Sequence, residues 1–158
     1  MTWDKGRDVI HAMLAKGHLE QIPANPDEVE YLIASGRRHL ASATLLADSD
    51  PELGYDAVYA AARKALTALL WNQGLRPTRA GGHEAVIEAA QAQYVPPLGE
   101  VLRPFRRLRG KRHGGDYLAS EGLVTPEDVL ADLPVATKIV DAAETILPNL
   151  TVFVPSRN

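Results

Sequence analysis

One stretch of the chain decides the fold: Leu53–Gln73, which reads LGYDAVYAAARKALTALLWNQ. As a helix, this stretch is apolar on nearly all sides, and the exceptions are Asp56, Arg63 and Lys64. A helix that is hydrophobic all round is typical of a buried position. We therefore predict a helix over residues 53–73 at the centre of a helical bundle.

The composition agrees with a bundle. A chain of 158 residues fits one domain, and 46% hydrophobic residues with only 6% aromatic ones indicate an aliphatic core of closely packed helices. The formal net charge of -3 gives no global attraction to nucleic acid or anionic membrane, so any such binding has to be local. The absence of cysteine excludes disulfides, thiolate metal ligands and a cysteine nucleophile.

Helices are predicted on both sides of the central one. Upstream, a helix from Pro26 to about Ala47 begins with a proline and two acids, which suit a first turn, and carries an apolar stripe. Before it, Trp3–Lys16 is predicted to form a short amphipathic helix that Gly17 ends. The two prolines within Ile22–Pro26 then predict a linker.

Downstream of the central helix, prolines and glycines divide the chain into further helices. One runs over about His83–Tyr94, and the next leads into a basic stretch in which Pro104 either kinks the helix or restarts it. The last begins at Thr125-Pro126, with threonine as the cap and proline at the first position, and its apolar face extends to Leu147.

The predicted fold is all-α: an antiparallel bundle of four to five helices with an extra N-terminal helix. Residues 1–25 form the N-terminal helix and linker, residues 26–148 the bundle, and residues 149–158 a short tail that is extended or disordered. The amino terminus has no apolar signal core, and Arg63-Lys64 interrupts the most apolar stretch. We therefore expect a cytoplasmic protein without a membrane span.

The stretch Arg103–Tyr117 is the most informative for function, because it concentrates positive charge in a chain that is acidic overall. If it is helical, one face carries Val101, Phe105, Leu108 and Arg112. The last place on this inward stripe is therefore an arginine. Because an unpaired buried charge is strongly unfavourable, the Arg112 guanidinium has to meet a carboxylate, a carbonyl, a phosphate or a partner subunit.

A second face of this helix carries Arg109, His113 and Tyr117, provided that the helix continues through the two glycines between the last two, and Asp116 is placed to pair with Arg112. Arginine, histidine and tyrosine around a phosphate indicate phosphodiester chemistry. The structural alternative is a solvated cationic helix end, in which His113 caps the last carbonyls, Tyr117 is a core ring and Asp116 a surface partner.

A second candidate for anion binding is the loop that holds Arg76, Arg79, Gly81 and Gly82. Such a loop either holds an anion on free backbone N–H groups or is a flexible turn with solvated charges. The second interpretation is favoured because no phosphate-loop spacing is present. The histidines are scattered without ligand spacing, so we predict neither a metal nor a cofactor.

Three segments together resemble the HEPN superfamily, and the likeness covers about residues 28–147. They are Tyr59–Leu66 (YAAARKAL) in the central helix, the turn Gly81-Gly82-His83, and the ending Arg107–Tyr117 (RLRGKRHGGDY). The chain looks most like small stand-alone bacterial members. The resemblance implies a HEPN-like bundle that forms a homodimer, in which the signature segments of two protomers meet in one cleft.

Many HEPN proteins are metal-independent endoribonucleases, found as toxins paired with a minimal nucleotidyltransferase antitoxin or in phage defence, and others are inactive binding modules. The family signature is an arginine, four to six residues and a histidine, commonly with a polar residue directly after the arginine. Arg106 or Arg107 with His113 fits this spacing literally. The alignment preferred here begins at Arg112-His113, and Tyr117 then takes the terminal place, where active members have histidine.

The resemblance also implies roles for the site. In an attack of the RNA 2'-hydroxyl on the adjacent phosphate, Arg112 stabilises the phosphorane charge and His113 moves the proton. Tyr117 positions the phosphate or is nucleotidylated by a partner, and Asp116 supports the site. The remaining basic side chains of the stretch are predicted to contact nucleic acid: Arg106, Arg107, Arg109 and Lys111.

Three functions stand as hypotheses. The first is a toxin that cleaves RNA at a dimer cleft. The second is a non-catalytic HEPN module that binds a nucleotidyltransferase or nucleic acid. The third is a structural bundle whose arginines only seal a dimer interface.

Overall fold

A computed structural model describes residues 4–95, 98–117 and 123–155, and for residues 113–117 it describes the backbone alone. The described chain is mostly helical, with one small two-stranded sheet. The elements, in chain order, are α1 (Arg7–Ala15), β1 (Leu19–Gln21), α2 (Pro26–Leu46), α3 (Pro51–Asn72), β2 (Leu75–Pro77), α4 (Gly82–Tyr94), α5 (Gly99–Leu102), α6 (Phe105–Tyr117), α7 (Pro126–Ile146) and the 3-10 helix η1 (Leu147–Asn149). The all-α bundle predicted from the sequence is confirmed.

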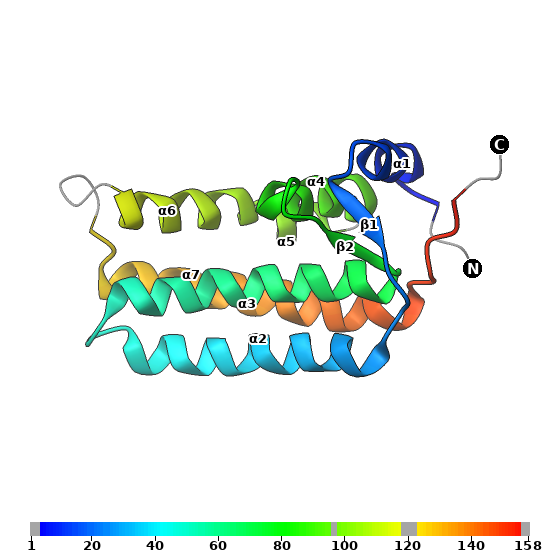
Figure 1. Ribbon diagram of the computed structural model, residues 1–158. Helices are drawn as coiled ribbons and strands as arrows, with labels where there is room; N and C mark the ends of the chain where they lie inside the picture. Colours follow the sequence, from blue (N-terminus) through cyan, green and yellow to red (C-terminus); the bar gives the residue numbers. More distant parts are fainter. Residues whose placement is uncertain (1–3, 96–97, 118–122, 156–158) are drawn as a thin grey trace.

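Helix α3 lies at the centre of the bundle, in contact with α2, α4, α6 and α7. Figure 1 shows α2, α3, α6 and α7 lying lengthwise beside one another. The central position follows from the sequence of α3, because alanines at Ala61, Ala62 and Ala65 are fully buried and let neighbouring helices approach closely. Helix α2 approaches α3 closely at Gly36, where an added Cβ would lie 3.3 Å from the carbonyl oxygen of Ala61.

The ends of the long helices are set by local capping. The side chain of Asn25 accepts hydrogen bonds from the first turn of α2, and Asp50 accepts one from the Leu53 N–H in α3. Thr125 and Asp128 form a reciprocal capping box at the start of α7, as predicted from the sequence. Pro134 lies inside α7 without ending it.

The small sheet was not predicted. Strands β1 and β2 pair antiparallel, with Leu19 opposite Pro77 and Gln21 opposite Leu75. Strand β1 ends just before the segment predicted to be a linker, and β2 overlaps the start of the loop predicted at Arg76. The sheet and α1 share a second, smaller apolar cluster, which consists of Ile10, Met13, Leu19, Leu70, Leu75, Ala85, Ala89 and Phe153.

The C-terminal segment, predicted to be extended or disordered, packs against this cluster. The Phe153 N–H donates a hydrogen bond to the Gln73 carbonyl at 2.8 Å, and Phe153 is buried. The Arg7 guanidinium of α1 donates to the Val154 carbonyl at 2.6 Å. Residues from both ends of the described chain therefore stabilise the same corner of the fold, as Figure 1 shows.

The helical path into the basic stretch is interrupted at Pro104, which restarts the helix: α5 ends at Leu102 and α6 begins at Phe105. The backbone of α6 stays helical through Gly114 and Gly115 to Tyr117. None of the helices in the described ranges is both long enough and apolar enough to cross a membrane.

Candidate functional site

The candidate site is centred on α6, which carries the basic stretch along the bundle. Phe105 and Leu108 are buried and fix which face of α6 points inward. Phe105 stacks on Tyr59 of α3, with ring centroids 5.7 Å apart and an angle of 10° between the rings. Phe105 and Leu108 of the predicted inward stripe are therefore confirmed, whereas Val101, predicted on the same helix, lies on α5 and is partly buried.

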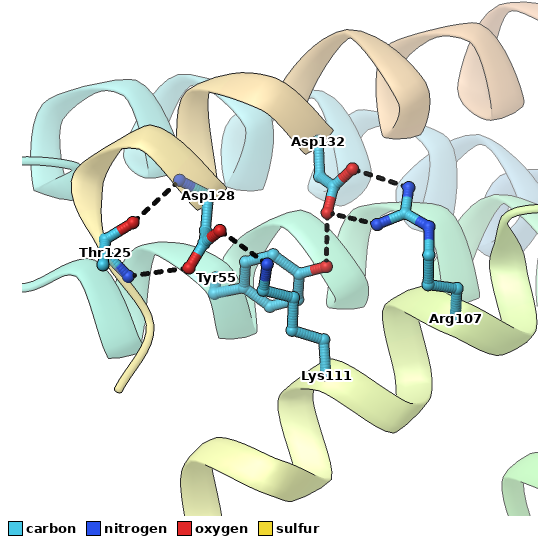
Figure 2. Close-up of polar contacts among 6 residues, drawn as sticks. All are labelled: Tyr55, Arg107, Lys111, Thr125, Asp128 and Asp132. Atoms are coloured by element: carbon cyan, nitrogen blue, oxygen red, sulfur yellow. Dashed lines mark hydrogen bonds and ion pairs between the residues drawn. The ribbon is translucent and has the colours of Figure 1, made fainter. Parts of the chain in front are cut away.

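Arg107 joins α6 to α7 through a carboxylate that lies inside the bundle (Figure 2). Its Nη1 and Nη2 atoms donate to Oδ2 and Oδ1 of Asp132 at 2.8 and 2.7 Å, and the Tyr55 hydroxyl donates to the same Oδ2 at 2.7 Å. Burial opposes ionisation of Asp132, but the hydrogen bonds from Arg107 and Tyr55 outweigh it and hold the pKa of Asp132 below its usual range. Burial and the Asp132 contact raise the pKa of Tyr55, so its hydroxyl remains a donor.

Lys111 makes a second link, one helical turn further along α6. Its Nζ donates to Oδ1 of Asp128 at 2.6 Å, while Oδ2 of Asp128 accepts from the Thr125 N–H at 3.0 Å. Figure 2 shows the two links side by side on the first turns of α7. The Lys111 hydrogen bond, helped by the Thr125 backbone, lowers the pKa of Asp128. Asp128, the acid of the α7 capping box, thus also holds α6.

Arg106 and Arg109 share one acid on α4. Arg106 Nη1 lies 2.8 Å from Oε1 of Glu84, and Arg109 Nη1 donates to Oε2 of the same side chain. Each basic residue predicted to contact nucleic acid therefore has a carboxylate partner within its own chain. Contact with nucleic acid stays a prediction for these residues.

Arg112 lies where the sequence placed it, at the inward edge of α6, and a carboxylate meets it there. Its Nε donates to Oδ1 of Asp56 at 3.1 Å, and its guanidinium lies over the Tyr59 ring, 5.4 Å from the centroid. Asp116, the partner suggested by spacing, lies with its side chain outside the described residues. The Arg112 side chain is 29% exposed, so solvent reaches it.

Three residues near Arg112 were not assigned to the site by sequence reasoning. Tyr59 contacts Arg112, and its hydroxyl lies 3.0 Å from Nδ1 of His83 in α4. Arg63, one turn further along α3, is close enough for the charge of Arg112 to lower its pKa, after the larger effect of burial. The signal for this cluster was the Gly81-Gly82-His83 turn together with the arginine interruption of the central helix.

The side chains of His113, Asp116 and Tyr117 lie outside the described residues, so their predicted roles stay predictions. Their backbone continues α6 beyond Arg112. Within the described ranges, no three histidine or acidic side chains gather in a way that would hold a metal ion.

Comparison with known proteins adds no assignment. No family model, curated protein or solved structure matches the chain. In the geometry of the site, an arginine held by a carboxylate and by the Tyr59 ring can bind an anion, and the hydroxyl of the same tyrosine pairs with His83.

Proposed function

We propose that the chain is a HEPN-type protein that cleaves RNA without a metal ion, acting as a homodimer with the C-terminal end of α6 in the cleft. The observation that carries the proposal is the way Arg112 is held. Asp56 fixes the Nε edge of the guanidinium and Tyr59 supports its face. No hydrogen bond joins its two terminal nitrogens to a described residue.

A guanidinium held in this way is pre-organised for a phosphate, because little rotamer freedom is left to lose when the anion binds. Its terminal N–H groups make charge-assisted hydrogen bonds that strengthen as negative charge develops on the phosphate oxygens. In the proposed reaction the 2'-hydroxyl attacks the adjacent phosphate, Arg112 stabilises the phosphorane, and His113 moves the proton. Tyr117 positions the phosphate or receives a nucleotidyl group from a partner enzyme.

The test is digestion of single-stranded RNA in the presence of EDTA by identically purified variants. Arg112→Gln is expected to slow cleavage by about 100-fold or more, the usual loss when one donor to a developing oxyanion is removed. His113→Gln is expected to lower the rate by about 100-fold or more, because it removes proton transfer. Arg103→Gln is the matched control, because Arg103 lies at the turn before α6, is highly exposed and pairs only with Glu100 among the described residues.

Cleavage at the wild-type rate by the Arg112→Gln/His113→Gln double variant would remove the proposed catalytic site. The dimer is tested by the mass of the chain in solution. A strict monomer would contradict a cleft formed by two copies of α6.

A non-catalytic HEPN module is the second candidate, and the ion pairs of α6 favour it. Glu84, Asp128 and Asp132 neutralise the arginines and lysine that precede Arg112, so the helix is well suited to a structural role. Such a module would bind RNA or a minimal nucleotidyltransferase without cutting RNA. Binding of labelled RNA, or a stable complex with a nucleotidyltransferase, in the absence of cleavage would favour this function.

A further inference from the structure

A pocket of about 400 Å³ lies between α3, β2 and the start of α4, and its lining is cationic. Arg63, Arg76, Arg79 and His83 line it, together with apolar surface from residues such as Trp71, and none of its lining residues is acidic. The volume is in the range of pockets that bind small organic ligands. This pocket borders the cluster around Arg112, because Arg63 and His83 belong to both.

Arg63 is the most unusual residue in the pocket. It lies on the central helix, half-buried, and burial lowers its pKa. Its guanidinium forms no hydrogen bond or ion pair with a described residue, and its Nε is shielded from solvent without a partner. A desolvated charge without a counter-charge is strongly unfavourable, so the position favours an anionic ligand.

The other described arginines show that the lack of a partner is not general in this protein. Those of α6 all pair with acids, and Arg37 pairs with both Asp141 and Glu144. Within the described ranges, the arginines without an ion pair are Arg38, Arg63 and Arg79, and the last two line this pocket. Arg76 also lines it and pairs with Glu20 at the rim.

The loop that carries Arg79 is tied down, which pre-forms the pocket. The Thr78 N–H donates to the His18 carbonyl at 3.0 Å, and the Gly82 N–H donates to the Thr78 carbonyl at 2.9 Å. The Gly81 N–H donates to the Thr78 hydroxyl at 3.2 Å. Because the N–H groups of Gly81 and Gly82 are used in these bonds, the backbone cradle considered from the sequence is not available, and side chains have to hold the anion.

We propose that this pocket binds the phosphate monoester of a small ring-bearing molecule, with Arg63 and Arg79 holding the phosphate and Trp71 and Val86 contacting the ring. Two guanidiniums without carboxylate partners match the charge of a phosphate monoester. The apolar surface of Trp71 and Val86 beside them can pack against the ring of the ligand. A nucleotide and a sugar phosphate share this chemistry, so the experiment has to separate them.

The test is calorimetric titration of the whole chain with inorganic phosphate, ribose 5-phosphate, 5'-AMP and, as the uncharged control, adenosine. Saturable binding of a phosphate monoester, tighter than that of inorganic phosphate, is expected, with no binding of adenosine. Tighter binding of 5'-AMP than of ribose 5-phosphate would identify a nucleotide, and the reverse order a sugar phosphate. Absence of saturable binding by either monoester would overturn the proposal.

Variants locate the binding. Arg63→Gln and Arg79→Gln are each expected to weaken binding at least about tenfold, as expected for loss of a hydrogen bond between charged groups. Arg79 is exposed on a loop, so its variant tests the pocket even if Arg63→Gln fails to fold. Arg38→Gln is the matched control, because Arg38 has no ion pair with a described acid, lies over the Tyr31 ring and does not line the pocket.

Equal affinity in the Arg79→Gln variant and the wild type would overturn the assignment of the site. Arg79→Gln also separates this inference from the proposed ribonuclease, because it should weaken binding of the monoester while RNA cleavage stays within about twofold of wild type. A loss of monoester binding in Arg112→Gln as large as in Arg79→Gln would place the ligand at α6 and overturn the pocket.

Discussion

Arg107 and Asp132 form a two-armed ion pair between α6 and α7, in which the arginine is largely open to solvent and the carboxylate is not. The side chain of Arg107 is 53% exposed, whereas that of Asp132 is 6% exposed. The Tyr55 hydroxyl completes the hydrogen bonding of Asp132 from α3. One buried carboxylate therefore connects three helices.

Replacement of Asp132 by asparagine should destabilise the fold. Asp132→Asn leaves Arg107 without its counter-charge and weakens the bond with Tyr55, and we expect a loss of about 2 kcal/mol, below the range for a fully buried pair because Arg107 is exposed. Urea unfolding measures the loss. Glu144→Gln is the control, since it removes an exposed carboxylate from the pair with Arg37 and should cost less than about 0.5 kcal/mol. Equal losses in the two variants would contradict the role of Asp132.

Because the pKa of Asp132 is lowered in the fold, the free energy of unfolding depends on pH in the acidic range. In the unfolded chain the carboxyl titrates near pH 4, and in the fold it titrates at lower pH. The stabilisation is therefore fully present above about pH 5 and is lost as the pH falls through the folded pKa. The free energy of unfolding between about pH 5 and pH 2.5 should fall less steeply in Asp132→Asn than in the wild type. Parallel profiles would count against this assignment.

A second pH effect is expected at His39 on α2. Burial lowers the pKa of His39, and the charges of Lys64, Arg38 and Arg63 lower it further. The unfolded chain then takes up a proton more readily than the fold, so the stability decreases as the pH falls below about 6.5. His39→Gln should flatten the profile of unfolding free energy between about pH 7.5 and pH 5.5. A profile that the substitution leaves unchanged would contradict the prediction.

The unpaired position of Arg63 predicts a variant that is more stable than the wild type in phosphate-free buffer. Arg63→Met keeps a long side chain and removes a desolvated charge, and we expect a gain of roughly 1 kcal/mol in the free energy of unfolding. Thermal or urea unfolding measures it. Arg37→Met, which removes an arginine that has two acidic partners, should give no gain. A loss of stability in Arg63→Met would show that the charge is already compensated without a ligand.

The helices could be predicted from the sequence because their signals are local. The apolar residues of α3 and the Thr125 cap of α7 act within one helix, and both predictions are confirmed. Strands β1 and β2 could not be predicted in the same way. They are three residues each and pair across more than fifty positions of sequence, which leaves no periodic pattern to detect.

In the candidate site, too, local features could be predicted from the sequence and contacts between distant segments could not. The helical spacing indicated that Arg112 points inward and needs a partner, but it did not identify Asp56, which lies on a helix distant in sequence. Arg63 was noted only as an interruption of the apolar helix and as part of the segment Tyr59–Leu66. Its lack of a carboxylate partner depends on how α3, α4 and β2 pack together. Helical patterns within a single sequence do not predict this packing.

The ion pairs that hold α6 make its packing more sensitive to ionic strength than the packing of the other bundle helices. Helices α2, α3 and α7 share a continuous apolar core. Helix α6 adds Phe105 and Leu108 to it, but its other described side-chain contacts are largely ion pairs that are partly open to solvent. Salt screens such pairs and leaves apolar contacts intact or stronger. Ionic strength is therefore a variable that loosens one helix of this protein selectively, and amide exchange in α6 should reveal it first.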